Sequence, residues 1–130
     1  MSEKKKEIEN LNCYLITAAM LYIKENSIDD YHDIEAINLF KETFLSKEEL
    51  TDYEEIVPAI TSEINKSQDY KMIYDDIYQT IVKPFVSKID NSEYKKAYFI
   101  FNSSFHSLKN AYLLPYIQSS FIEAFKRARG

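Results

Sequence analysis

The sequence predicts an all-α protein: a compact, single-domain antiparallel bundle of five to seven helices that occupies residues 1–130. Its composition is that of a globular chain, with 45% hydrophobic and 28% charged residues. Gly130 is the only glycine, which disfavours the tight Asn-Gly and Asp-Gly turns of β-hairpins. Apolar residues recur at three- and four-residue spacing, and no long segment alternates with the two-residue period of a strand.

Two helices are predicted in the N-terminal part of the chain. A stripe of apolar residues predicts the first helix from about Lys5 to Glu25. The members of this stripe are Ile8, Leu11, Leu15, Ala18, Ala19 and Tyr22. Asp29 or Asp30 is expected to cap a second helix that ends near Phe44, because carboxylates accept hydrogen bonds from the free N–H groups of a first turn.

A third helix is predicted after Ser46. Glu49 follows this serine three residues later, which is the pattern of a capping box, and apolar residues then repeat as far as Ile64. Pro58 lies inside the repeat, and proline lacks an N–H group and crowds the preceding turn. We therefore expect a kink at Pro58 or a separate short helix that begins there.

A fourth helix is predicted after the polar segment 65–69. Two stripes with four-residue spacing run along it, one of isoleucine and one of tyrosine. They consist of Ile73, Ile77 and Ile81, and of Tyr70, Tyr74 and Tyr78. Pro84 then predicts a kink or a restart of the helix.

Two more helices are predicted in the C-terminal part. Asn91 and Ser92 are expected to cap a helix that reaches Phe105, and Ser107 is expected to open the last one. Pro115 predicts a kink in that last helix. The helix is predicted to end in three cations, which suit the negative end of its dipole. They are Lys126, Arg127 and Arg129.

The near absence of glycine excludes several kinds of site. Phosphate-binding loops, the EF-hand loop and the nucleophile elbow all need glycine where the backbone turns sharply or approaches a ligand. Cys13 is the only cysteine, so an internal disulfide is excluded and a buried, unreactive thiol is expected. The only histidines are His32 and His106, and neither lies in a catalytic motif. We therefore expect no enzyme activity and no cofactor.

Charge is distributed unevenly along the chain, whose net charge is −5. Residues 25–63 contain twelve acidic side chains against two lysines, whereas residues 95–130 contain six basic side chains against one glutamate. Two interpretations are open. The two segments neutralise each other as neighbouring helices, or the acidic segment is a docking surface that steers a basic partner toward it.

The docking interpretation selects a set of partner-binding residues. Tyrosine is enriched, with eleven residues, and it suits protein interfaces because it is large, stiff and polar at one end. The set joins the acidic residues to the tyrosine stripe and consists of Glu25, Asp29, Asp30, Asp33, Glu35, Tyr70, Tyr74 and Tyr78. The alternative is that the tyrosine rings form an outer layer of the core.

A helical metal-binding regulator is the alternative function for the same region. Divalent metals accept carboxylate and imidazole ligands, and the candidates are Asp29, Asp30, His32 and Glu35. The order of an apolar helix end, an acidic break and an Asp-rich helix start resembles the tellurite-resistance TerB-like helical domains, although their Asp-Gly step is absent here. A further alternative is a homodimeric structural protein joined through its aromatic stripes.

Protein binding is the expected function. We expect a small acidic inhibitor or adaptor, of the immunity or anti-defence type, that covers a basic surface on a protein partner. The negative charge argues against a nucleic-acid partner. The longest apolar stretch, residues 13–23, is too short to span a membrane, so a cytoplasmic location is expected. Fourteen lysines against two arginines indicate an AT-rich genome, such as that of a low-GC bacterium or a phage.

Overall fold

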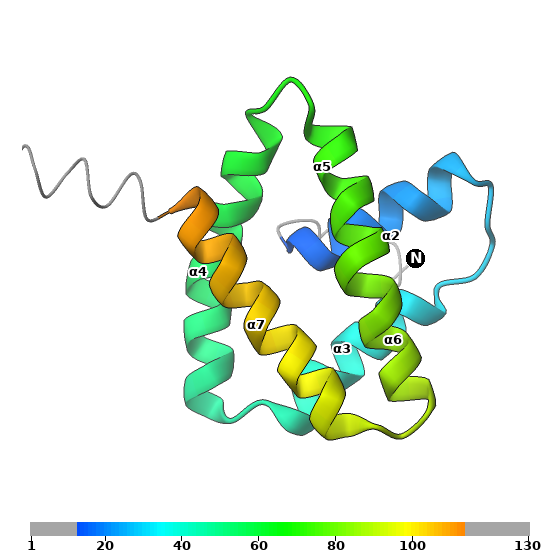
Figure 1. Cartoon of the computed structure of the whole chain (residues 1–130), viewed down its shortest axis with the longest axis vertical. Coiled ribbons are helices and arrows are strands. Elements are labelled where there is room, and N and C mark those ends of the chain that lie inside the picture. The colour runs from blue at the N-terminus through cyan, green and yellow to red at the C-terminus, as the bar shows by residue number, and fades with distance from the viewer. Residues whose placement is uncertain (1–12, 114–130) are drawn as a thin grey trace, which may run out of the picture.

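The computed structural model describes residues 13–113, and this part of the chain is all-α, as predicted (Figure 1). It contains six α-helices and one π-helical turn. These are α2 (Tyr14–Glu25), α3 (His32–Phe44), α4 (Lys47–Asn65), α5 (Tyr70–Ile77), the π-turn η2 (Tyr78–Val82), α6 (Lys83–Asp90) and α7 (Tyr94–Tyr112). Because α5, η2 and α6 follow one another without a gap, they form one long rod.

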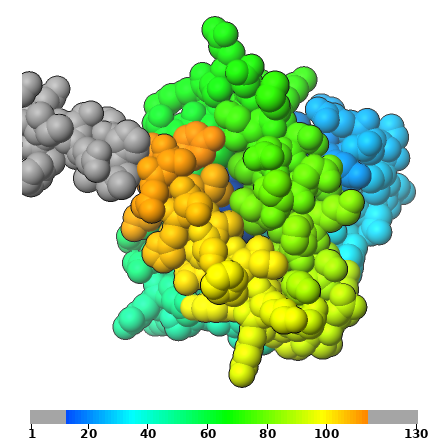
Figure 2. All heavy atoms as spheres, viewed as in Figure 1, coloured from blue at the N-terminus to red at the C-terminus, as the bar shows by residue number. Residues whose placement is uncertain are grey.

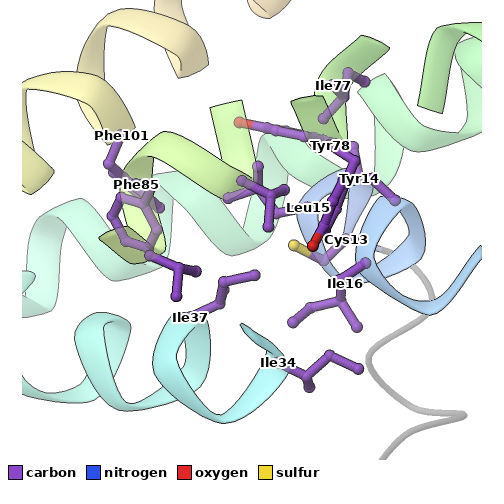
Figure 3. Packing of buried hydrophobic residues seen from close by; sticks show 14 of the residues in the cluster. Cys13, Tyr14, Leu15, Ile16, Ile34, Ile37, Ile77, Tyr78, Phe85 and Phe101 are labelled. Carbon is purple, nitrogen blue, oxygen red and sulfur yellow. The ribbon is translucent and has the colours of Figure 1, made fainter. Parts of the chain in front are cut away.

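Helix α2 is the most buried helix of the described bundle. It contacts α3, α4, α5 and η2, and half of its residues lie inside the protein. Tyr14, Leu15 and Ile16 are buried in succession, which requires neighbours on all sides of the helix rather than on one face (Figure 3). The α5–η2–α6 rod and α7 lie in front of α2, while α4 stands at the left side of the molecule (Figure 1).

An aromatic cluster joins four helices in the core. Phe101 of α7 packs against Phe85 of α6 and against Phe40 of α3, with ring centroids 6.0 and 5.5 Å apart. Phe40 and Phe85 meet edge to face at 4.8 Å. Tyr53 of α4 completes the cluster at 5.0 Å from Phe101, so four helices meet at one group of rings.

The starts of α3 and α4 show how well capping could be predicted. Ser46 and Glu49 form the expected capping box: the Glu49 N–H donates to the serine hydroxyl, and the Ser46 N–H donates to the glutamate carboxylate. Helix α3 begins later than predicted, because Tyr31 occupies its N-cap position. Asp30 still acts locally, since its carboxylate accepts a hydrogen bond from the His32 N–H at 3.0 Å.

The prolines have different effects. Helix α4 runs through Pro58 as one helix, which excludes the second of the two predicted alternatives, a separate short helix that begins there. Burial of Ile60 and Ile64 beyond the proline holds α4 in place. The break predicted near Pro84 takes the form of η2, in which the Lys83 N–H bonds to the Tyr78 carbonyl five residues back. Pro115 lies outside the described residues.

The predicted helix boundaries at Asn91 and Ser92 and at Ser107 are wrong. Asn91 and Ser92 form the turn between α6 and α7, and the N-cap residue of α7 is Glu93. Ser92 adopts a left-handed conformation, with φ of 60°, because the chain reverses direction there. Ser107 lies inside α7, which continues to Tyr112 because the apolar face persists through Leu108. The part of the first predicted helix before Cys13 and the predicted cationic end lie outside the described residues.

Candidate functional site

The acidic residues of segment 25–63 do not form one surface. Some lie at the corner where α2 turns into α3, and others lie along α4. These two regions stand on opposite sides of the described bundle (Figure 1). We call the first, made of Glu25, Asp29, Asp30 and Glu35, the α2–α3 corner. We call the second, made of Glu48, Asp52 and Glu55, the acidic face of α4. A single partner patch would meet only one of them.

The tyrosine stripe lies largely in the core, which corrects part of the predicted binding set. Tyr74 and Tyr78 are buried, so their rings are not available to a partner, whereas Tyr70 is 37% exposed. The Tyr74 hydroxyl donates to the Asn65 side chain at 2.5 Å, and burial raises the pKa of Tyr74 to about 12. Tyr78 stacks on Tyr22 with ring centroids 3.9 Å apart. The alternative interpretation, tyrosine as an outer core layer, is the one that the structure supports.

Asp33 belongs to the fold rather than to a free surface. Its carboxylate accepts a hydrogen bond from the Tyr78 hydroxyl at 2.7 Å, which joins α3 to η2. Desolvation and this carboxylate together raise the pKa of Tyr78. Changing Asp33 would therefore disturb packing as well as surface charge, which makes it a poor probe of partner binding.

The His32 side chain is hydrogen-bonded to the neighbouring helix α6. Its Nε2 atom lies 2.8 Å from an Asp90 carboxylate oxygen at the end of α6, and the two side chains are about half exposed. The hydrogen bond to Asp90 raises the pKa of His32. Among the described residues no group of three or more His, Cys, Asp or Glu side chains is arranged to hold a metal ion. The four predicted metal ligands are therefore not brought together.

We expect the His32–Asp90 pair to stabilise the protein only at acidic to neutral pH. Because the folded protein raises the pKa of His32, the stabilisation is complete below the unfolded value of about 6.5 and is lost as the pH rises through the folded value. For a half-exposed pair it amounts to about 0.5 kcal/mol. Denaturant titrations of wild type, Asp90→Asn, His32→Gln and the double variant give the coupling energy at each pH. A coupling energy that is equal at acidic and alkaline pH would contradict the assignment.

The acidic face of α4 consists of unpaired carboxylates. Glu48, Asp52 and Glu55 are exposed and follow at intervals of four and three residues, so they line one side of the helix. None of them forms a salt bridge with another described residue. Helix α4 carries one lysine and six acidic residues, of which only Glu63 has a basic partner in the described part of the chain, Lys66 at 3.0 Å.

The basic helix α7 lies beside α4 but does not neutralise it. The two helices are in contact, and α7 crosses the front of the molecule next to α4 (Figures 1 and 2). Their polar link among the described residues is a short hydrogen bond from the Tyr98 hydroxyl to the Glu49 carboxylate. This bond, together with Ser46, lowers the pKa of Glu49. The described residues therefore contain no ion pair between α4 and α7, and three of the six basic side chains of segment 95–130 lie outside the described residues.

A pocket of about 150 Å³ opens between α4 and α7. Its apolar lining consists of Leu45, Tyr53, Ile56, Phe101 and Phe105, and its polar lining of Glu49, Asp52, Asn102, His106 and Lys109. Sequence reasoning missed this pocket because its two walls are about fifty residues apart in the chain. The signal that was available is the change of charge between its walls, since acidic residues line the α4 side and basic residues the α7 side.

The described residues offer charge and an apolar pocket rather than a reactive constellation. Cys13 is buried, as predicted, with its sulfur 3.2 Å from the Tyr53 hydroxyl, whereas His106 lies at the exposed rim of the pocket. In the described range no helix combines the length and the apolarity that crossing a membrane requires.

A scan against models of protein families, a search of curated proteins and a search of solved structures each found no match.

Proposed function

We propose that the protein is a non-enzymatic protein-binding module that docks a basic surface of a partner protein on the acidic face of α4. The observation that carries the proposal is a row of exposed carboxylates that have no salt-bridge partner within residues 13–113 and that lie directly beside an apolar pocket. A small acidic inhibitor or adaptor of the immunity or anti-defence type is the concrete form, and it acts by covering the partner's basic surface.

Each half of this surface has a separate role. Carboxylates of one sign create a field that steers a basic partner toward α4 and repels acidic proteins. Charges alone give little affinity in water, because exposed ion pairs contribute only about 0–1 kcal/mol each. An apolar pocket beside the charges supplies the desolvated centre that strong interfaces need. The α2–α3 corner has similar charge, but none of its residues lines this pocket.

The proposal predicts that charge reversal on α4 abolishes capture of the partner. In a pulldown from host lysate followed by mass spectrometry, the Glu48→Lys, Asp52→Lys, Glu55→Lys variant should lose the proteins that the wild type retains. We expect the affinity for an identified partner to fall at least about tenfold, and the wild-type complex to weaken with added salt. The three side chains are exposed and unpaired, so the fold should tolerate their reversal.

A variant of the α2–α3 corner provides a matched control. Glu25→Lys, Asp29→Lys, Glu35→Lys changes the net charge by the same amount at side chains that are also exposed. This variant should retain the partner, and thermal melting should show that both variants are folded. Loss of the partner from the corner variant alone would move the docking surface there. Equal retention by both variants would end the electrostatic docking proposal.

A further inference from the structure

The α4–α7 pocket has the size of one side chain. Sites for free organic ligands usually measure about 300–1,000 Å³, and this pocket measures about 150 Å³. An apolar cavity of about 150 Å³ holds a ring the size of benzene. The dimensions therefore suit one aromatic side chain presented by a larger molecule.

The interior of the pocket favours an aromatic ring. Phe101 and Phe105 come from α7, and Tyr53 comes from α4. The ring centroid of Tyr53 lies 5.0 Å from that of Phe101 and 5.3 Å from that of Phe105. Tyr53 and Phe101 are buried and form the floor of the pocket, whereas Phe105 is only partly buried. A further ring would lie on this floor and against Phe105, in the offset and tilted contacts that aromatic groups prefer. Tyr53 is itself fixed by the core, where its hydroxyl meets Cys13, so this part of the pocket is rigid before anything binds.

The two rims of the pocket carry opposite charge. Asp52 stands on the α4 side, and Lys109 stands on the α7 side, and neither forms a salt bridge with another described residue. Basic groups of a bound segment are attracted to the α4 rim and repelled by Lys109. A bound segment whose basic groups lie on only one side of the side chain that fills the pocket would therefore bind in a single orientation.

We propose that the pocket receives one aromatic anchor of a basic partner segment, whose lysines or arginines lie over the acidic face of α4. The flank of the segment that meets Lys109 is neutral or acidic. This inference rests on the proposed function and specifies the partner's chemistry. The anchor supplies affinity by burying apolar area in a preformed pocket, and the flanking bases supply orientation and selectivity.

Model peptides test the anchor directly on the full-length protein. One peptide carries a run of lysines on one side of a phenylalanine and neutral residues on the other, and its control replaces the phenylalanine with alanine. Both are made in both sequence orders, and binding is measured by calorimetry. In the favoured order, the phenylalanine peptide should bind about tenfold or more tightly than its alanine control, because a phenyl ring is removed from water.

Variants of the protein distinguish the contribution of the pocket to peptide affinity from the contribution of the charges. Asn102→Trp places a large side chain at the exposed rim and should remove the advantage of the phenylalanine peptide while leaving the alanine peptide unchanged. Lys109→Glu should tighten binding of both peptides, because it removes a repulsive charge. The Glu48→Lys, Asp52→Lys, Glu55→Lys variant should weaken both. A gain of affinity in Lys109→Glu cannot arise from unfolding, which keeps the test informative.

Each contrary outcome has a distinct meaning. Equal affinity of the two peptides, with both weakened by the α4 variant, would overturn the anchor and leave the proposed function intact. Absence of binding by either peptide would overturn the anchor, and the lysate capture would still decide the proposed function. The segment 114–130 of this chain also contains phenylalanines and bases. Tighter phenylalanine-peptide binding by Lys126→Glu, Arg127→Glu would assign the pocket to that segment instead.

Discussion

Replacing Phe101 with alanine is expected to lower the free energy of unfolding by about 3–5 kcal/mol. The side chain is 5% exposed, and its ring contacts Phe40, Tyr53 and Phe85, which come from three other helices. Alanine would remove these contacts and leave a void that the surrounding helices cannot fill without separating from α7. Because a small domain is stable by only about 5–15 kcal/mol, a substantial fraction of its stability is at stake.

Phe99 provides the matched control for Phe101. It lies two residues earlier on the same helix, but 71% of its side chain is exposed. Phe99→Ala removes the same atoms and should change the free energy of unfolding by no more than about 0.5 kcal/mol. Denaturant titration of the two variants measures the difference. Similar losses for both would show that α7 does not contribute Phe101 to the core in this way.

The helices were predictable because their signals are local. A three- and four-residue apolar period, a Ser-x-x-Glu pattern and the position of a proline act within a turn or two of the chain. The capping box of Ser46 and Glu49 is an example, since both partners lie within four residues. At Pro58 the sequence left two outcomes open, because the cost of a missing hydrogen bond is local, whereas the burial of Ile60 and Ile64 that keeps α4 continuous depends on distant helices.

The role of the tyrosine stripe could not be decided from spacing. The isoleucine and tyrosine stripes of segment 70–81 are one residue apart, so both patterns fit a buried face equally well. In the structure the core side lies between them: Tyr74, Ile77 and Tyr78 are buried, whereas Ile73 and Ile81 are partly exposed. Only the position of α2 and α3 relative to this rod selects that face.

Only the charge of the candidate site could be predicted from the sequence, because its shape depends on how distant helices pack. An excess of acidic residues in segment 25–63 is visible in the sequence, and those on the acidic face of α4 have no salt-bridge partner among the described residues. The split into two separate surfaces follows from how α3 leads into α4, which no local pattern encodes. The pocket depends on two walls, near residues 45–56 and 101–109, whose meeting is a property of the packed bundle.

The buried tyrosines predict unfolding in alkali. Tyr14, Tyr53 and Tyr74 are buried, and loss of hydration is the main cause that raises the pKa of each above the ordinary tyrosine value of about 10. Above about pH 10 the unfolded chain releases these protons while the folded protein retains them. Stability present below that pH is therefore lost as the pH rises, by about 1.4 kcal/mol per pH unit for each tyrosine and about 4 kcal/mol for the three.

Tyr14→Phe tests this account, because the Tyr14 hydroxyl is buried without a hydrogen-bond partner among the described residues. At neutral pH the stability of the variant should equal that of the wild type to within about 1 kcal/mol, since it retains the buried ring and removes a hydroxyl that has no hydrogen-bond partner among the described residues. Above pH 10 its stability should fall less steeply than that of the wild type, by about 1.4 kcal/mol per pH unit. Denaturant titrations give both quantities, and tyrosinate absorbance reports ionisation.

In the wild type this absorbance should rise for the three buried rings only as the helical circular dichroism is lost. Ionisation of all tyrosines near pH 10 in a protein that stays helical would show that these rings are accessible to water, and the arrangement of α2 at the centre of the bundle would have to be revised.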